Sequence, residues 1–481
     1  MTALRPLRIG ISGKRAIEKE ERDKVYREIR TTIKHLLHEH GAASFIGVSA
    51  LAYGADTLFA EVVTREFEMP VEVILPFDRT EYEKDFAGED LETFGRLMRH
   101  AGAHTVVTRE IPADDAARNA AYFAVGKKIV DECDEMVIVW DGLQPGGIGG
   151  TAEIIGYLAE TKRRPHIPYI KVRPAKPDKL NEELIHTYER ANKLAIEARD
   201  RYRRVWTWAI LLGWVTVVCF ALKTAFYIEQ TWGLFLTAAE FVFVAVVYAL
   251  IFIARKRKYH GHYLQERLKA ETCRLLRIFY QAGIAVDIAE QSKEQATMLV
   301  GVAEKVNRAI GDEKQGSKWY TQYVIKGLIR EQCEYHDKKV RSIGNRHSLF
   351  EQVNLVIGLL FLANLMGHLA HILLVHDDKV SQAWLYKFSV FFNLLFPASY
   401  AALEGVIYFN EWMLIKKYCG AAGISLKEAE NQLPFDLEKL TFEESHAKQA
   451  QVLHLISNVM LMDNRNWNLL LEDKDNYHLI V

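Results

Sequence analysis

The chain has 481 residues, which exceeds the usual size of one hydrophobic core, so two or more domains are expected. Its formal net charge of −1 excludes the strongly basic character of proteins that bind nucleic acid polymers. The five cysteines are scattered without a CxxC pair, so the sequence predicts no metal site and indicates reduced thiols.

Residues 1–178 alternate short apolar runs with helical patterns, which is typical of an α/β domain with a doubly wound, Rossmann-like parallel sheet. Ligands bind such sheets beyond the carboxyl ends of the strands, near the point where the strand order reverses. The expected strands are Leu7–Ile11, Ser44–Gly47, Val71–Leu75, His104–Val107, Met136–Trp140 and Pro168–Val172. The expected helices lie near 18–40, 54–67, 80–102, 114–132 and 150–162.

Three loops that follow expected strands combine glycine with hydroxyl or charged side chains, at Gly10–Arg15, Gly47–Asp56 and Asp141–Glu153. Glycine allows positive φ and close approach of the backbone, and a helix start offers unpaired N–H groups to an anion. The sequence therefore predicts a phosphate-containing ligand. The predicted ligand-binding residues are Ser12, Gly13, Lys14, Arg15, Ser49, Gly54, Ala55, Asp56, Asp141, Gly142, Gly146, Gly147, Gly149, Gly150, Thr151 and Glu153.

The charged members of this set have distinct expected roles. Lys14 and Arg15 are predicted to meet phosphate oxygens, which a guanidinium can bind in a bidentate manner. Asp56 follows a glycine turn, where it is expected either to accept a ribose hydroxyl or to cap its helix. Glu153 has three possible roles: ligand contact, capping of N–H groups, or catalysis.

A family resemblance covers roughly the first 175 residues. Its residues are Gly10–Arg15, Gly47–Glu61, Leu75-Pro76, Tyr82, Asp85-Phe86, Cys133–Gly142 and Pro145–Glu153. Together they resemble the SLOG superfamily, Rossmann-like domains similar to the "lonely guy" hydrolases, DprA and the N-terminal region of TRPM channels. The resemblance implies a pocket for a nucleotide-derived ligand, such as a cyclic oligonucleotide or an ADP-ribose isomer, with no resident cofactor.

The resemblance also bears on catalysis. In the phosphoribohydrolases of this group a PGGxGTxxE motif supplies a catalytic glutamate, and an upstream Arg-Lys pair assists it. Glu153 holds the glutamate's place, so it would be the catalytic residue of a hydrolase. An extra glycine at Gly149-Gly150 and the offset of Lys127-Lys128 depart from that pattern, which favours binding without hydrolysis.

Two prolines at 174 and 177 end the α/β domain, and four long apolar runs follow. Spans of about 205–222 and 233–254 form one expected hairpin within a segment 179–290. Spans of about 352–375 and 384–409 form a second within a segment 291–481. Charged, helix-prone sequence flanks both hairpins, so the sequence predicts an all-α membrane region with cytosolic helices.

Basic clusters set the expected orientation. Arg199–Arg204 precede the first span and Arg255–Lys258 follow the second, which places both clusters and both chain termini in the cytoplasm by the positive-inside rule. Two hairpins with basic flanks resemble the SLATT family, two-span domains associated with SLOG domains in bacterial conflict systems. That resemblance implies a multi-pass protein of the bacterial inner (plasma) membrane.

Each hairpin has one glutamate in its second span, Glu240 and Glu404. Ionisable groups in a bilayer are costly unless they face a bundle interior or water, so we expect these residues to line a pore. The alternative is a packing residue, for example paired with Lys223. His368 and His371 lie one helical turn apart in the third span and are further pore candidates. Four spans per chain rarely enclose a wide pore, so a homo-oligomer is expected.

The expected function is a sensor of a nucleotide-derived second messenger coupled to a membrane effector that permeabilises or depolarises the inner membrane. The resemblances imply a role in antiviral defence or abortive infection. A membrane-tethered hydrolase of a nucleotide or NAD derivative is the first alternative. A membrane receptor or scaffold that positions a partner is the second.

Overall fold

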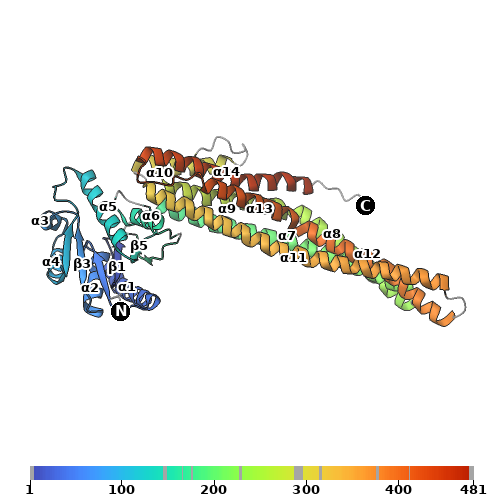
Figure 1. Ribbon diagram of the computed structural model, residues 1–481. Helices are drawn as coiled ribbons and strands as arrows, with labels where there is room; N and C mark the ends of the chain where they lie inside the picture. Colours follow the sequence, from blue (N-terminus) through green and yellow to red (C-terminus); the bar gives the residue numbers. More distant parts are fainter. Residues whose placement is uncertain are drawn as a thin grey trace. The chain divides into compact units, whose positions relative to one another are not determined.

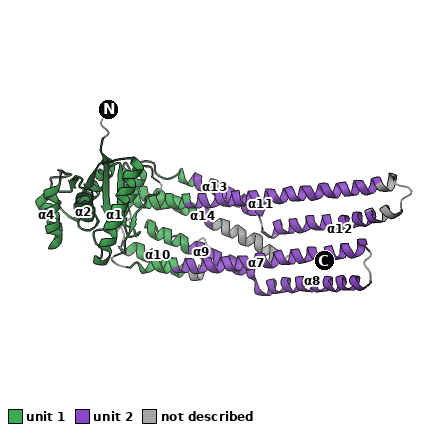
Figure 2. Ribbon diagram, turned by 90° about the horizontal axis from the view of Figure 1, so that it is seen from below, with its two compact units in different colours: residues 1–185, 273–330, 429–456 green, residues 186–272, 331–428, 457–481 purple. Residues whose placement is uncertain are grey.

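The computed structural model describes residues 5–144, 149–164, 166–174, 177–226, 230–286, 296–313, 317–374, 379–410 and 412–475 (Figure 1). The chain forms two compact units, and neither is continuous in sequence (Figure 2). Unit 1 comprises residues 1–185, 273–330 and 429–456, and unit 2 comprises residues 186–272, 331–428 and 457–481. The α/β domain thus shares unit 1 with helical pieces from both of the later expected segments.

Six parallel strands form the sheet of unit 1, in the order β4-β3-β2-β1-β5-β6. Their bounds are β1 Leu7–Gly13, β2 Phe45–Ser49, β3 Val71–Leu75, β4 Ala103–Val106, β5 Glu135–Trp140 and β6 Ile170–Lys171. All six expected strands are present, so the predicted fold class is confirmed. The order runs outward from β1 to β4 and then returns to the other side of β1 at β5, which makes the β1–β5 boundary the topological switch point.

Helices cover both faces of this sheet (Figure 1). Side chains of α1 Lys19–His40, α2 Ala55–Glu66 and α4 Glu89–His100 share one core, and those of α5 Asp115–Glu132 and α6 Thr151–Thr161 share another. The β5 residues alternate between the two cores, because successive side chains of a strand point to opposite faces: Val137 and Val139 join the first, Met136 and Ile138 the second. Each such side chain contributes about 1.5–3 kcal/mol when it is fully buried.

The expected helix over 80–102 is wrong as one continuous element. The structure has a short helix α3, Arg79–Tyr82, a 3-10 turn η1, Glu83–Asp85, and the separate helix α4. Phe86 takes an extended conformation and Gly88 has φ +54°, a value that glycine adopts without a steric penalty. The chain therefore turns at this point, and Phe86 enters the core against Phe94.

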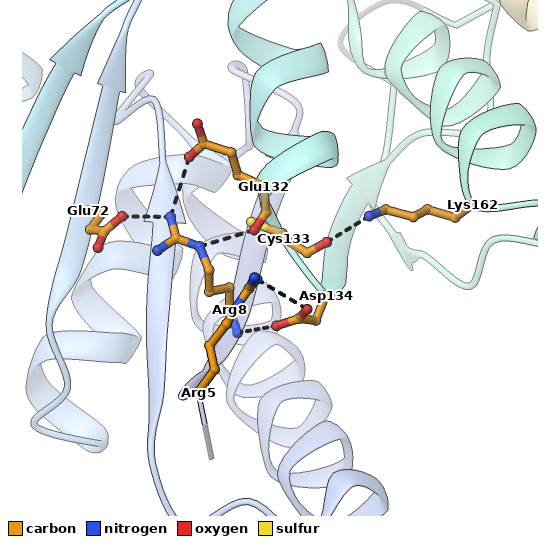
Figure 3. Close-up of polar contacts among 7 residues, drawn as sticks. All are labelled: Arg5, Arg8, Glu72, Glu132, Cys133, Asp134 and Lys162. Carbon is orange, nitrogen blue, oxygen red and sulfur yellow. Dashed lines mark hydrogen bonds and ion pairs between the residues drawn. The ribbon is translucent and has the colours of Figure 1, made fainter. Parts of the chain in front are cut away.

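Ion pairs fasten the amino ends of the strands (Figure 3). The Arg8 guanidinium lies 2.6 Å from the Glu72 carboxylate and donates to the Glu132 carbonyl at 3.1 Å, so it connects β1 with β3 and α5. The backbone N–H of Arg8 donates to Asp134 at 2.9 Å. Lys162 donates to the Cys133 carbonyl at 3.0 Å, and burial raises the pKa of the Cys133 thiol to about 12. This network lies at the amino ends of the strands, opposite their carboxyl ends, and holds the strands in register.

A second, smaller core joins the helical pieces of unit 1. It packs Leu184 of α7, Lys179–Phe226, against Leu276 and Tyr280 of α9, Tyr259–Ala282, and against Val306 of α10, Ala296–Glu313. The Asn307 amide donates to the Val286 carbonyl at 3.0 Å and accepts from the Val286 N–H at 2.8 Å, which satisfies the backbone after α9 ends. The other described pieces of unit 1 are the first part of α11, Lys318–Leu374, and residues 429–456, which include the first part of α14, Phe442–Asp475.

Among the described residues, four helices are long and apolar enough to cross a membrane, the architecture of a multi-pass membrane protein. The elements that contain them are α7 Lys179–Phe226, α8 Gln230–Arg257, α11 Lys318–Leu374 and α12 Lys379–Asn410, and α13 Trp412–Glu430 follows α12. Large apolar side chains such as Trp232, Leu234 and Phe241 are exposed on α8, as expected of a surface in contact with lipid. In α7 the charged segment and the first predicted span form one unbroken helix.

Candidate ligand-binding site

A cavity of about 480 Å³ lies at the carboxyl ends of β1 and β5, beside the loop that follows β2. Its walls come from the loop after β1, the start of α2, the start of α6 and one side of α5. This position is the crevice at the switch point, where parallel α/β sheets bind their ligands. The sequence predicted a site near this point from the glycine-rich loops alone.

Two glycines allow the first two loops to pack against each other. A Cβ atom on Gly13 would lie 2.3 Å from the Ala55 Cβ, which is closer than real contacts allow. Gly54 has φ +93°, and a Cβ atom there would lie 2.0 Å from the Arg15 carbonyl oxygen. The Ala55 N–H donates to the Lys14 carbonyl at 3.0 Å across this contact. Gly54 and Ala55 thus shape the cavity from behind the lining residues.

The two predicted phosphate-binding cations both line the cavity. Lys14 Nζ lies 2.8 Å from Asp141 Oδ2, and the Asp141 side chain is buried. The Arg15 guanidinium lies over the Tyr122 ring at 4.5 Å and near the Tyr53 ring at 5.8 Å. Stacking on aromatic rings fixes the plane of a guanidinium while leaving its N–H groups available at the edge.

Asp56 lies in the cavity wall and is buried. Burial raises the pKa of this carboxyl to about 7, although the Arg15 charge and hydrogen bonds from the Ala50 and Ala52 N–H groups favour the ionised form. Ser49 accepts the Leu51 N–H at 3.0 Å and also bonds Asp56, so it supports the turn from outside the lining. A carboxyl that titrates near neutral pH can both accept and donate hydrogen bonds.

A polar network sets the position of Tyr122, which the sequence analysis did not identify. Arg118 donates to Asp85 at 2.8 Å, to Glu81 at 3.0 Å and to the Tyr122 hydroxyl at 2.9 Å. The Tyr122 hydroxyl in turn donates to Asp85. These bonds connect α5 to the short helix after β3, and they hold the ring on which the Arg15 guanidinium stacks.

The glycine-rich start of α6 forms the remaining wall of the cavity. Gly149 has φ +86°, and a Cβ atom there would lie 2.8 Å from the Asn119 carbonyl of α5, so only glycine fits. Gly150 is the N-cap of α6, and Thr151 is its first residue. Gly146 and Gly147 lie outside the described residues.

The Glu153 side chain does not line the cavity, unlike the neighbouring Thr151. Its carboxylate accepts the Gly149 N–H at 2.7 Å and a hydrogen bond from Ser317, at the start of α11. Burial raises the pKa of Glu153, against the opposing effect of these bonds and of the Lys318 and Lys127 charges. The capping role that the sequence left open is therefore present in the structure.

The structure brings together residues from all three predicted loops. The predicted residues that line the cavity are Ser12, Gly13, Lys14, Arg15, Asp56, Asp141, Gly149, Gly150 and Thr151. Of the other described predicted residues, those outside the lining are Ser49, Gly54, Ala55, Gly142 and Glu153. The wall that α5 supplies was missed, at Asn119, Tyr122, Gly126 and Ile129. Their spacing of three or four residues on an expected helix was the available signal.

The intramembrane candidates lie in unit 2, where the described polar residues make hydrogen bonds between helices. Lys223 Nζ lies 2.9 Å from the Glu240 carboxylate and 3.1 Å from the Thr237 hydroxyl. Asn354 donates to Glu404 at 2.8 Å. The pairing of Glu240 with Lys223 is the alternative named from the sequence.

The two histidine candidates are described to different extents. The His368 ring lies 5.7 Å from the Tyr386 ring, and the side chain of His371 lies outside the described residues. Within the described part of the chain, no group of three His, Cys, Asp or Glu side chains is placed to hold a metal ion.

No model of a known protein family matches the chain, and no curated protein matches it in sequence. The functional assignment therefore depends on the chemistry of the cavity and on the helices long enough to cross a membrane. The cavity offers three cations, Lys14, Arg15 and Arg173, together with a glycine-rich helix start and a carboxyl group with a pKa near neutrality. These groups complement an anionic ligand that also carries hydroxyl groups.

Proposed function

We propose that the α/β domain binds a nucleotide-derived ligand and that the membrane helices respond by permeabilising or depolarising the membrane. The cavity at the switch point carries this proposal, because it places two basic side chains beside a glycine-rich helix start. Both features bind phosphate in proteins, and here they line one cavity.

The parts of such a ligand have distinct partners in the proposal. A phosphate group binds Lys14 and the N–H groups at the start of α6, and displaces the Lys14 ammonium from Asp141. A ribose hydroxyl bonds Asp56. A base stacks beside Tyr53, near the guanidinium of Arg15. ADP-ribose isomers and cyclic oligonucleotides contain all three parts.

The membrane part of the proposal has energetic and topological requirements. A ligand changes the membrane helices only if it binds their active state more tightly than the resting state. Basic residues flank the expected spans, so we propose that both termini face the cytoplasm of a bacterial cell and that the chain lies in the inner membrane. The active form is proposed to be a homo-oligomer, and its role to be antiviral defence.

A membrane-tethered hydrolase is a second candidate, and one observation favours it. Asp56 lines the cavity with a pKa of about 7, which suits a general acid or base. Glu153, the residue that the resemblance would make catalytic, is instead bonded to Gly149 and Ser317. Under this reading Asp56→Asn removes turnover while retaining ligand binding.

The deciding experiment uses the full chain in detergent micelles, with ADP-ribose, cyclic di-AMP, NAD and AMP as probes. Melting temperature and the integrity of each probe are followed in the same samples. A sensor is stabilised by about 2.7 kcal/mol at a ligand concentration 100-fold above Kd, and the ligand is recovered intact. Lys14→Ala is expected to abolish the stabilisation, whereas Lys24→Ala, which alters an exposed pair with Glu28, leaves it unchanged.

Each outcome selects one of the functions. A stabilising probe recovered intact supports the sensor, and leakage from vesicles containing the full chain then tests the membrane response. A probe consumed by the wild type and spared by Asp56→Asn supports the hydrolase. Absence of stabilisation by every probe contradicts the nucleotide-derived ligand and favours a membrane receptor or scaffold.

A further inference from the structure

The first turn of α11 packs directly on α6 within unit 1. A Cβ atom on Gly156 would lie 2.4 Å from the Trp319 carbonyl carbon and 2.6 Å from the Tyr320 nitrogen, so the two backbones approach as closely as glycine permits. The Trp319 ring packs edge-on against Tyr157 at 5.0 Å, and the Tyr320 ring lies 6.0 Å from Trp140. The start of α11 is therefore part of the core on the α5–α6 face of the sheet.

Glu153 connects this helix start to the glycine loop of the cavity. Ser317 caps α11, because its hydroxyl oxygen accepts the Tyr320 N–H at 3.2 Å. The carboxylate of Glu153 bonds Ser317 on one side and accepts the Gly149 N–H at 2.7 Å on the other. One buried carboxylate thus lies between the first turns of α6 and α11, where both helix dipoles favour its charge.

A second set of contacts holds the same helix start from the C-terminal part of unit 1. Lys318 Nζ donates to the Leu437 carbonyl at 2.6 Å and to the Leu440 carbonyl at 2.8 Å. Lys127 of α5 lies 3.1 Å from Glu438 in the same loop. Glu153 and Lys127 therefore both contact segments that surround the start of α11.

We propose that Glu153 is a positioning residue that reports occupation of the cavity to α11. The proposal rests on the proposed ligand-binding function of the same site. An anion bound at the start of α6 competes with Glu153 for the Gly149 N–H, since one N–H makes a short, linear hydrogen bond to only one acceptor at a time. The Glu153 carboxylate then changes its position relative to Ser317, and the hydrogen bonds by which Ser317 caps α11 change with it. The helix runs unbroken from Lys318 to Leu374 and contains the third candidate span.

Because Glu153 and the ligand compete for the Gly149 N–H, the proposal predicts whether removal of Glu153 raises or lowers the affinity for the ligand. If Glu153 contacted the ligand directly, its removal would weaken binding. As a competitor for Gly149, its removal instead strengthens binding, by roughly tenfold for one hydrogen bond to a charged group. Thermodynamic coupling is reciprocal: if the contact of Glu153 with the start of α11 affects ligand binding, ligand binding must change the stability of the first turns of α11.

The first test needs no ligand. Amide hydrogen exchange of residues 317–330 is measured by mass spectrometry in the full chain in detergent, for Glu153→Ala, Ser317→Ala and the double variant. We expect the protection factors to be non-additive by about fivefold, because the two side chains share one interaction. Additive effects within error would overturn the Glu153–Ser317 connection, whatever the ligand.

The second test adds ADP-ribose, with Glu160→Gln as the matched control. Glu160 pairs with Lys326 at 2.7 Å and joins the same two helices, and within the described residues its side chain does not bond Gly149. In the wild type and in Glu160→Gln, ADP-ribose is expected to change the exchange of residues 317–330. In Glu153→Ala it binds more tightly without that change. Weaker binding, or an undiminished response of α11, would contradict the proposal.

Failure of ADP-ribose to bind the wild type is a separate result. It would count against the ligand class of the proposed function, while the ligand-free cycle would still decide whether Glu153 and Ser317 act together. The two proposals therefore fail in distinguishable ways.

Discussion

Asp56 and Glu153 are both buried carboxyl groups, and burial raises the pKa of each. Their partners differ in kind. Asp56 faces the cavity and the Arg15 charge, so a ligand can change its protonation state. Glu153 is enclosed by the first turns of two helices, so its charge is set by protein groups. At the residue scale, one carboxyl lines the cavity and the other bonds the starts of two helices.

Asp56 should make the stability of the chain depend on pH. Its pKa of about 7 exceeds the model-peptide value of 3.8, so the folded state holds a proton that the unfolded state releases. The contribution of protonated Asp56 to the stability of the folded state is fully present below pH 3.8 and is lost as pH rises through 7. Asp56→Asn should therefore stabilise the protein at pH 8 by up to about 4 kcal/mol and flatten the pH profile between 4 and 7.

Melting temperatures of the full chain between pH 5 and pH 8 check this expectation. Asp115→Asn, at an exposed position on the first turn of α5, is the control and should leave the profile of the wild type in place. An Asp56→Asn variant that is no more stable than the wild type at pH 8 would show that the carboxyl is ionised at little cost in the folded protein.

At the scale of elements, the turn between β2 and α2 determines the back of the cavity. Leu51 and Gly54 both have positive φ there, at +55° and +93°. For leucine this conformation is strained by about 1 kcal/mol or more, and it is held by the Leu51 N–H bond to Ser49. Strain of this kind is often retained where a backbone must present groups to a ligand.

Gly54→Ala should destabilise the chain and weaken ligand binding. The new methyl group would meet the Arg15 backbone at 2.0 Å in a conformation with φ +93°, so we expect a loss of about 2–4 kcal/mol. Gly95→Ala is the matched control, because a Cβ atom there meets only the end of the Arg99 side chain, at 3.9 Å. It should stabilise α4 by about 0.5–1 kcal/mol in thermal unfolding. Equal effects of the two substitutions would contradict the close packing of the loops.

Hydropathy and glycine placement were sufficient to predict the six strands, the membrane helices and the loops at the switch point. Apolar periodicity did not predict the break in the helix at Gly88. The periodicity continues on both sides of this residue, although the chain turns there. The contact of the Glu153 side chain with Ser317 was also not predicted. Its partner Ser317 lies far along the chain, and the packing of α11 on α6 is not visible in either segment alone.

The whole chain is organised around helices that belong to both units. α9 and α11 each begin in one unit and end in the other, so neither unit is an independent segment that could be excised. The expected boundary at residue 178 marks the end of the α/β elements, while residues 317–330 and 434–440 complete the core against α6. Experiments on ligand binding therefore need the full chain rather than its first 178 residues.

The intramembrane carboxyl groups provide the last prediction. Glu240 is paired with Lys223, so removing either of these two charges alone would leave the other without its partner, whereas Glu404 accepts a hydrogen bond from the neutral Asn354 amide. The variant Lys223→Gln, Glu240→Gln, Glu404→Gln removes all three charges and keeps the size of each side chain. If the carboxyl groups line a path for ions, dye and proton leakage from vesicles should fall at least about fivefold, since ionisable groups in a bilayer usually serve such paths. Glu351→Gln, at an exposed position on α11, should leave leakage unchanged. Unchanged leakage in the triple variant would assign the three residues to helix packing instead.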